Sequence, residues 1–118
     1  MSRLLMLSFA TLFLCGGCAE PIRETPVTKL TVPTTQRECA AAGGHWGPVG
    51  LARNLRCDIK TTDVGMACTD SSQCQGFCLA TEGTLEGASV IGSCSAYIAN
   101  FGKVVFVEHG KAEGYNIE

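Results

Sequence analysis

Residues 68–78 read Cys68-Thr-Asp-Ser-Ser-Gln-Cys74-Gln-Gly-Phe-Cys78, and this stretch decides the fold. The cysteines that flank it are Cys39, Cys57 and Cys94. In a short exported chain, an even number of cysteines at such spacings indicates a disulfide framework. We therefore predict a small disulfide-rich domain, mainly β with one short N-terminal helix.

The sequence alone does not choose among the possible pairings of these six cysteines. Proximity and interleaving favour three pairs, namely Cys39–Cys57, Cys68–Cys78 and Cys74–Cys94. Each disulfide contributes roughly 2–4 kcal/mol, mainly by restricting the unfolded chain. A domain of this size buries too little apolar surface to dispense with such bridges.

A metal site is the alternative use of these cysteines. Structural zinc sites favour two close pairs of cysteine or histidine ligands. Here only one C-x3-C pair is present, and His45 and His109 lie far apart in the sequence. We therefore expect no metal and no other cofactor.

The first residues have the organisation of an export signal. Arg3 precedes an apolar run over residues 4–14 that contains no charge, and small residues follow. The run is far shorter than the ~20 residues that span a membrane. This pattern predicts a signal peptide over residues 1–17, and the alternative is a buried N-terminal helix.

The small residues Cys15-Gly16-Gly17-Cys18-Ala19 resemble a lipobox, the motif at which lipoprotein signal peptidase cuts before a lipid-bearing cysteine. The resemblance implies that Cys18 carries the acyl chains, palmitate among them, and makes the membrane a partner through this lipid. Cys15 departs from the motif, since leucine is usual there, and a cut after Ala19 is the alternative. Because Ala19 is not aspartate, the resemblance implies an outer-membrane lipoprotein that faces the periplasm.

Residues 18–35 are rich in proline and threonine and predict a lipid anchor followed by a flexible tether. The alternative is an edge strand that uses Val27, Leu30 and Val32. The stapled domain would then span residues 36–118.

Within the domain, Thr35 and Glu38 form a capping box, which predicts a helix over residues 36–42. Gly47-Pro48-Val49-Gly50 predicts a turn. Alternation predicts that Leu55, Cys57 and Ile59 point inward from a strand over 55–60. Further strands are expected within 76–79, 89–97 and 104–108, the last pairing back with 111–117.

Four motifs together resemble a group of small cysteine-rich bacterial exported proteins: Cys39-Ala-Ala-Ala-Gly-Gly-His-Trp-Gly-Pro48, Asp63-Val-Gly-Met-Ala-Cys68, Ser72-Gln-Cys-Gln-Gly-Phe-Cys78 and Gly92-Ser-Cys-Ser95. The resemblance covers residues 38–118 and implies no activity. Members carry two more cysteines, at places that here read Lys103 and roughly Tyr115. The resemblance therefore implies that this chain lacks one bridge of the group.

Few residues offer a site. His45 and Trp46 form a possible recognition pair, although a sole tryptophan more often fills a core. Asp63, Asp70 and Glu82 lack the spacing of a calcium loop, so the first two are expected to cap turns. Ser89 lacks the second glycine of a nucleophile elbow. We expect no catalytic residues and no enzyme activity.

Charge excludes one further class of function. Without Arg3 the chain has eight basic residues against eleven acidic ones, with no basic stripe, so no nucleic-acid partner is expected. The expected function is a membrane-anchored, non-catalytic binding or envelope-structural module with an unidentified protein partner. The alternative is an inhibitor of an envelope-directed hydrolase, lysozyme or a protease. An inhibitor requires a protruding loop, with 46–52 and 81–88 as candidates, whereas a structural module predicts a buried Trp46.

Overall fold

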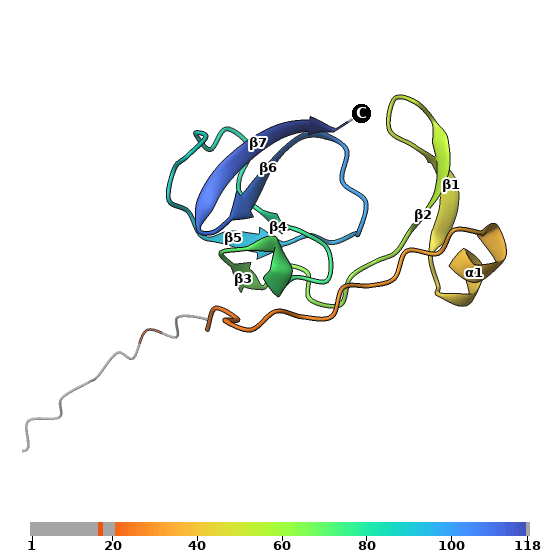
Figure 1. Ribbon diagram of the computed structural model, residues 1–118, viewed down its shortest axis with the longest axis horizontal. Coiled ribbons are helices and arrows are strands. Elements are labelled where there is room, and N and C mark those ends of the chain that lie inside the picture. The colour runs from red at the N-terminus through yellow and green to blue at the C-terminus, as the bar shows by residue number, and fades with distance from the viewer. Residues whose placement is uncertain (1–16, 18–20, 118) are drawn as a thin grey trace, which may run out of the picture.

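The computed structural model describes residue 17 and residues 21–117 (Figure 1). Its elements are α1 (Gln36–Ala41), β1 (His45–Val49), β2 (Asn54–Asp58), β3 (Ala67–Cys68), the 3₁₀ helix η1 (Ser71–Gln73), β4 (Cys78–Leu79), β5 (Gly92–Cys94), β6 (Gly102–Glu108) and β7 (Lys111–Ile117). The predicted fold class, mainly β and disulfide-rich with one short N-terminal helix, is confirmed.

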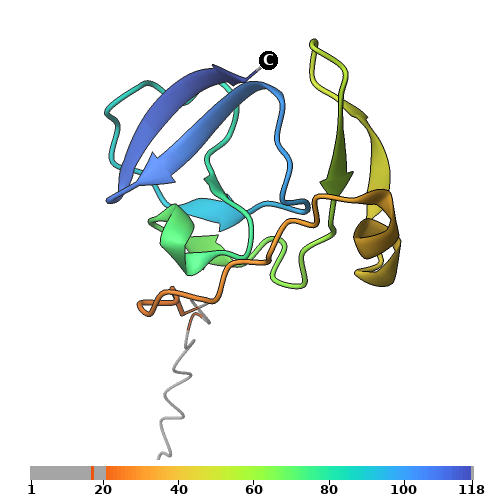
Figure 2. The same ribbon diagram turned by 45° about the vertical axis from the view of Figure 1, so that its right-hand side comes forward.

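The strands form two antiparallel sheets. β1 and β2 pair as a hairpin, and the second sheet has the order β3-β5-β4-β6-β7. Figure 2 shows that the hairpin stands beside the five-stranded sheet rather than within it. The molecule thus presents a small ribbon next to a larger body.

Three disulfides stabilise the two parts, one at the hairpin and two within the body. They join Cys39 to Cys57, Cys68 to Cys78 and Cys74 to Cys94, the same pairs that proximity and interleaving favour. The last four of these cysteines surround the buried Val107 of β6, with Ala80 and Val90 packed against the cluster. Sulfur therefore supplies much of the small core.

Local sequence explains the helix. The Thr35 side chain accepts a hydrogen bond from the Glu38 amide, so the predicted cap is present. Cys39 on this helix bonds to Cys57 on β2 and ties α1 to the hairpin. Gly44 lies so close to this bridge that a Cβ there would be 2.7 Å from the Cys57 Sγ. Only glycine fits at this position without a shift of the bridge.

The predicted turn at 47–50 is wrong, because Gly47, Pro48 and Val49 belong to β1. The chain reverses one step later, where Gly50 and Arg53 have φ of 65° and 53° and the Arg53 amide donates to the Gly50 oxygen. Proline is tolerated in β1 because this strand is an edge strand of a two-stranded ribbon.

The expected inward orientation of Leu55 is also wrong, since its side chain is 62% exposed. Cys57 is buried as expected, and Ile59 is half-buried just beyond the end of β2. The difference arises because α1 covers only the base of the hairpin, near Cys57 (Figure 1). Alternation identifies which residues share one face of the strand, but it does not show how much of that face α1 covers.

The C-terminal hairpin forms as predicted. Glu108 pairs with Lys111, and His109 and Gly110 between them have φ of 49° and 74°. Positive φ at both central residues is what a two-residue type I′ turn requires. In the same register Lys103 faces Asn116 and Val104 faces Tyr115, so the two places that the resemblance associates with a further bridge lie on adjacent strands.

Residues 21–34 (hereafter the N-terminal segment) were expected to be a free tether, but they are docked on the domain. The Val27 amide donates to the Ser72 oxygen at 3.0 Å, and an Arg23 nitrogen lies 3.6 Å from an Asp63 oxygen. The segment is extended without being a strand of either sheet, so the alternative of an edge strand is not observed either.

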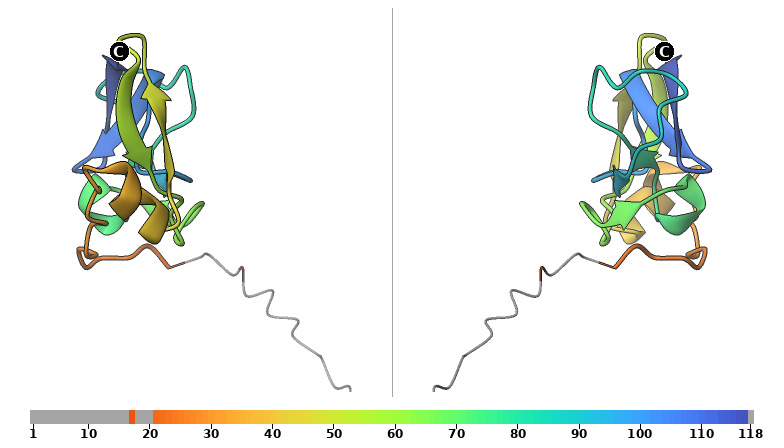
Figure 3. Two further views of the ribbon diagram at one scale, coloured as in Figure 1. Left: turned by 90° about the vertical axis from the view of Figure 1, so that its right-hand side faces the viewer. Right: turned by 90° about the vertical axis from the view of Figure 1, so that its left-hand side faces the viewer.

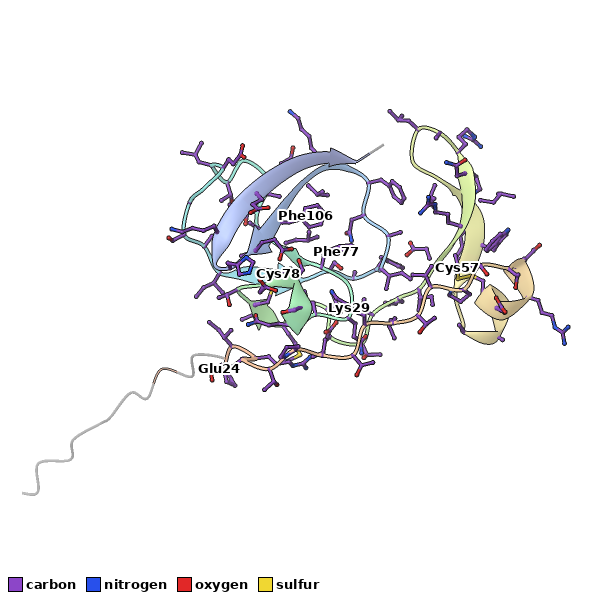
Figure 4. All side chains as sticks on the ribbon, in the orientation of Figure 1. Glu24, Lys29, Cys57, Phe77, Cys78 and Phe106 are labelled. Atoms are coloured by element: carbon purple, nitrogen blue, oxygen red, sulfur yellow. A yellow bond between two sulfur atoms is a disulfide. The ribbon has the colours of Figure 1, made fainter. Side chains whose placement is uncertain are left out.

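Lys29 makes the strongest of these contacts (Figure 4). Its amine donates to the Ser71 oxygen at 2.6 Å and to the Gly76 oxygen, and it lies 5.5 Å from the centre of the Phe77 ring. The residue as a whole is exposed, but its amine is inserted against the body. The resulting desolvation lowers the pKa of Lys29, although the negative charges of three acidic residues act to raise it.

Candidate recognition surface

The hairpin carries an apolar face that nothing covers along its outer half. Pro48 and Leu55 are cross-strand partners in the register and both are exposed. Leu51, in the loop at the tip, is 80% exposed. We call Pro48, Leu51 and Leu55 the hairpin patch. Single exposed apolar residues are ordinary, but three on one short ribbon form a candidate contact surface.

Trp46 extends the hairpin patch toward the base of the ribbon. Residues two positions apart in a strand share a face, so Trp46 lies on the same face as Pro48. Trp46 is paired with Cys57 in the register and is half-buried. It is therefore neither the fully buried core residue nor the fully exposed anchor that the sequence left open.

The structure separates His45 from Trp46. His45 is exposed, and strand alternation places it on the opposite face of β1. A Cβ at Gly47 would lie 3.0 Å from a ring nitrogen of His45, so the imidazole lies over Gly47. The predicted recognition pair is thus divided between the two faces of one strand.

The second candidate loop, residues 81–88, also protrudes. Leu85 is 79% exposed, and the loop is fixed to β7 because the Gly87 amide donates to the Ala112 oxygen at 2.7 Å. The Ala112 amide donates in turn to the Ala88 oxygen. This loop offers one large exposed apolar side chain, whereas the hairpin patch has three exposed apolar members.

Of the two carboxylates expected to cap turns, Asp70 does so, but that of Asp63 contacts a residue 12 positions away. Asp70 accepts from the amides of Ser72 and His109, and these hydrogen bonds, the one from His109 foremost, lower the pKa of Asp70 to about 2. Asp63 is buried and accepts from the Gln75 amide, while its other oxygen has no partner among the described residues. Glu82 lies exposed in the loop 81–88.

Two other groups resemble reactive sites. Lys111 Nζ donates to Ser89 Oγ at 2.6 Å, but both residues are exposed, so the amine is not desolvated as a catalytic base would be. The sulfur atoms of Cys68, Cys74 and Cys94 lie within 4.8 Å of one another, and all three are committed to disulfides. A disulfide offers no thiolate to a metal.

The proposed lipid site lies outside this geometry. Cys18, with most of the predicted signal peptide, is outside the described residues. Across the part that is described, no helix is both long and apolar enough to cross a membrane.

Comparison with known proteins identifies no relative of this chain. No protein-family model, curated protein or solved structure matches the chain.

Proposed function

We propose that this chain is a membrane-anchored, non-catalytic binding module that recognises an envelope protein through the hairpin patch. The observation that carries the proposal is the exposure of Leu51 and Leu55 on a ribbon beside the main sheet. Apolar side chains held out on a stapled element lose little conformational freedom when a partner covers them. The anchor is Cys18, on the basis of the lipobox resemblance.

Of the two halves of the expected function, binding has the better support. A purely structural module would bury Trp46 and expose no contiguous apolar face. Here Trp46 is half-buried and continues into the hairpin patch, whose members stay exposed. Large apolar and aromatic side chains near the centre of a contact supply most of its binding free energy.

Affinity capture from envelope extracts with paired variants tests the proposal. We expect Leu51→Asp to abolish recovery of the partner, because a carboxylate at the tip would be desolvated on binding. Leu85→Asp is the matched control, since Leu85 is equally exposed but lies in another loop. Loss of the partner with Leu85→Asp and retention with Leu51→Asp would transfer the contact to the loop 81–88.

Inhibition of an envelope-directed hydrolase is the second candidate, favoured by the form of the hairpin tip. The Arg53 amide closes the tip on the Gly50 oxygen, and the Cys39–Cys57 bridge holds the base. A narrow, stapled loop of this kind can enter an active site. Purified domain should then reduce lysozyme or protease activity, and Leu51→Asp should relieve the inhibition.

A further inference from the structure

A pocket of about 350 Å³ lies between the hairpin and the body. One side is formed by β2 with Asn54 and Arg56, on the face of the ribbon opposite the hairpin patch. The apolar lining comes from Val32, Phe77, Ile98 and Phe101. The volume is at the lower end of the ~300–1,000 Å³ that is usual for ligand sites.

The pocket lies where the antiparallel pairing between residues 59–61 and residues 96–98 ends. Below it, the Ile98 amide donates to the Ile59 oxygen and the Thr61 amide donates to the Ala96 oxygen. The Ala99 amide still donates to the Asp58 side chain at the end of β2, and beyond it residues 100–101 line the other side of the pocket without a backbone hydrogen bond to β2 among the described residues. The antiparallel pairing that begins at the base is thus not continued along the rest of β2.

Strand alternation shows which backbone groups this divergence leaves open. Ile59 and Thr61 direct their backbone groups toward residues 96–98, so Leu55 and Cys57, four and two positions before Ile59, direct theirs to the same edge. Pro48 is consistent with this assignment. It is the register partner of Leu55, and because the backbone groups of Leu55 point away from β1, Pro48 needs no N–H to pair with it. Among the described residues, no backbone hydrogen bond from outside the hairpin reaches this edge at Leu55 or Cys57.

The two edges of the ribbon differ in what they can bind. On β1, Pro48 removes one donor from the outer edge, which blunts that edge. On β2, the corresponding edge keeps the N–H and C=O of both Leu55 and Cys57. An open strand edge beside an apolar pocket is the arrangement that receives an added strand.

Resting on the proposed function, we infer that the pocket receives an extended segment of the partner protein, which adds to β2 as an antiparallel or parallel strand. On the face that enters the pocket, the segment would carry apolar side chains for Phe77 and Phe101 and a carboxylate for Arg56, at positions two residues apart. Arg56 sets the charge preference, because it is the one charged residue among the described residues that line the pocket. The partner thus contacts both faces of the hairpin.

A random linear peptide library selected on the oxidised chain tests this inference. The selected peptides should contain Asp or Glu two positions from an apolar residue, so that both side chains share the face that enters the pocket. Leu55→Pro should weaken their binding about tenfold or more, since it removes the Leu55 amide, whereas Leu55→Ala keeps that amide and measures how much of the loss comes from the side chain alone. Arg56→Ala should weaken binding, and Arg53→Ala, on the tip outside the pocket, should not.

Hydrogen exchange keeps the test valid if Leu55→Pro fails to fold. In the unmodified chain, the selected peptides should slow exchange of the Leu55 and Cys57 amides. Failure to select peptides, or unchanged exchange at both amides, would overturn the inference. Peptides lost with Leu51→Asp but retained with Leu55→Pro would leave the proposed function standing and remove the added strand. A dimer of the chain that Leu55→Pro dissociates would assign the pocket to a second copy.

Discussion

Cys78 and Cys94 face each other across the β4–β5 pair, yet each is bonded to a different cysteine, Cys68 and Cys74 respectively. Two bridges therefore cross the same small core of the five-stranded sheet. The third bridge, Cys39–Cys57, lies outside this core and joins α1 to the hairpin.

This division predicts different outcomes when bridges are removed. The sequence separations of Cys39–Cys57 and Cys74–Cys94 are 18 and 20 residues, so loop-closure entropy gives each about 3 kcal/mol. The double Ser variant of the first pair should release α1 and the hairpin while the sheet stays protected from hydrogen exchange. The double Ser variant of the second pair should lose protection throughout the sheet, because it also places hydroxyls in the core. Equal loss in both variants would contradict the division.

Lys29 should hold the N-terminal segment on the domain. Lys29→Met keeps the length of the side chain but removes the donors to the Ser71 and Gly76 oxygens. We expect the Val27 amide, bonded to the Ser72 oxygen, to exchange about tenfold faster or more, with a loss of about 1–2 kcal/mol in the free energy of unfolding. Lys103→Met, at an exposed position on β6, is the control. Unchanged exchange at Val27 would show that the segment is held by its other contacts.

Asp70 predicts a pH dependence of stability. Its pKa is lowered from 3.8 to about 2 in the folded chain, so its contribution is complete above pH 4–5 and is lost as the pH falls toward 2. At neutral pH, Asp70→Asn should cost at most about 2 kcal/mol in the free energy of unfolding. Urea unfolding of both proteins at pH 7 and pH 2 checks this, because the difference should largely disappear in acid. A difference that persisted at pH 2 would attribute the loss to geometry rather than to charge.

Cys18 should determine membrane attachment. Cys18→Ala should leave the protein unprocessed or release it from the membrane fraction, because no lipid can then be attached. Cys15→Leu is the control, as it restores the usual residue of the lipobox and should preserve anchoring. Fractionation with intact mass measurement distinguishes the outcomes, and an anchored, processed Cys18→Ala protein would contradict the lipid site.

Local signals in the sequence predicted the elements that local interactions stabilise. The Thr35 cap and the turn at His109-Gly110 depend on residues within a few positions, and both are present. The three cysteine pairs that proximity and interleaving favour are present, although the sequence alone did not choose among the possible pairings. The fold class followed from these features together.

Contacts between residues that are distant in the sequence could not be predicted from local signals. The bonds of Lys29 reach carbonyls 42 and 47 positions away, and backbone carbonyls carry no signal in the sequence. Pro48 was interpreted as a turn residue because proline favours the second position of a turn, but its lack of an N–H also suits an edge strand. Leu55 was placed inward because alternation does not reveal whether another element covers the face. The pocket beside β2 depends on the divergence of two chains, which no local pattern marks.

The route of the N-terminal segment has a mechanical consequence. In Figures 1 and 3 it runs along the side of the molecule opposite the hairpin tip. A pull on the N-terminus reaches the body first through Arg23 and Lys29, before it reaches α1 or β1. A pull on the N-terminal segment is thus carried first by the body that two disulfides cross.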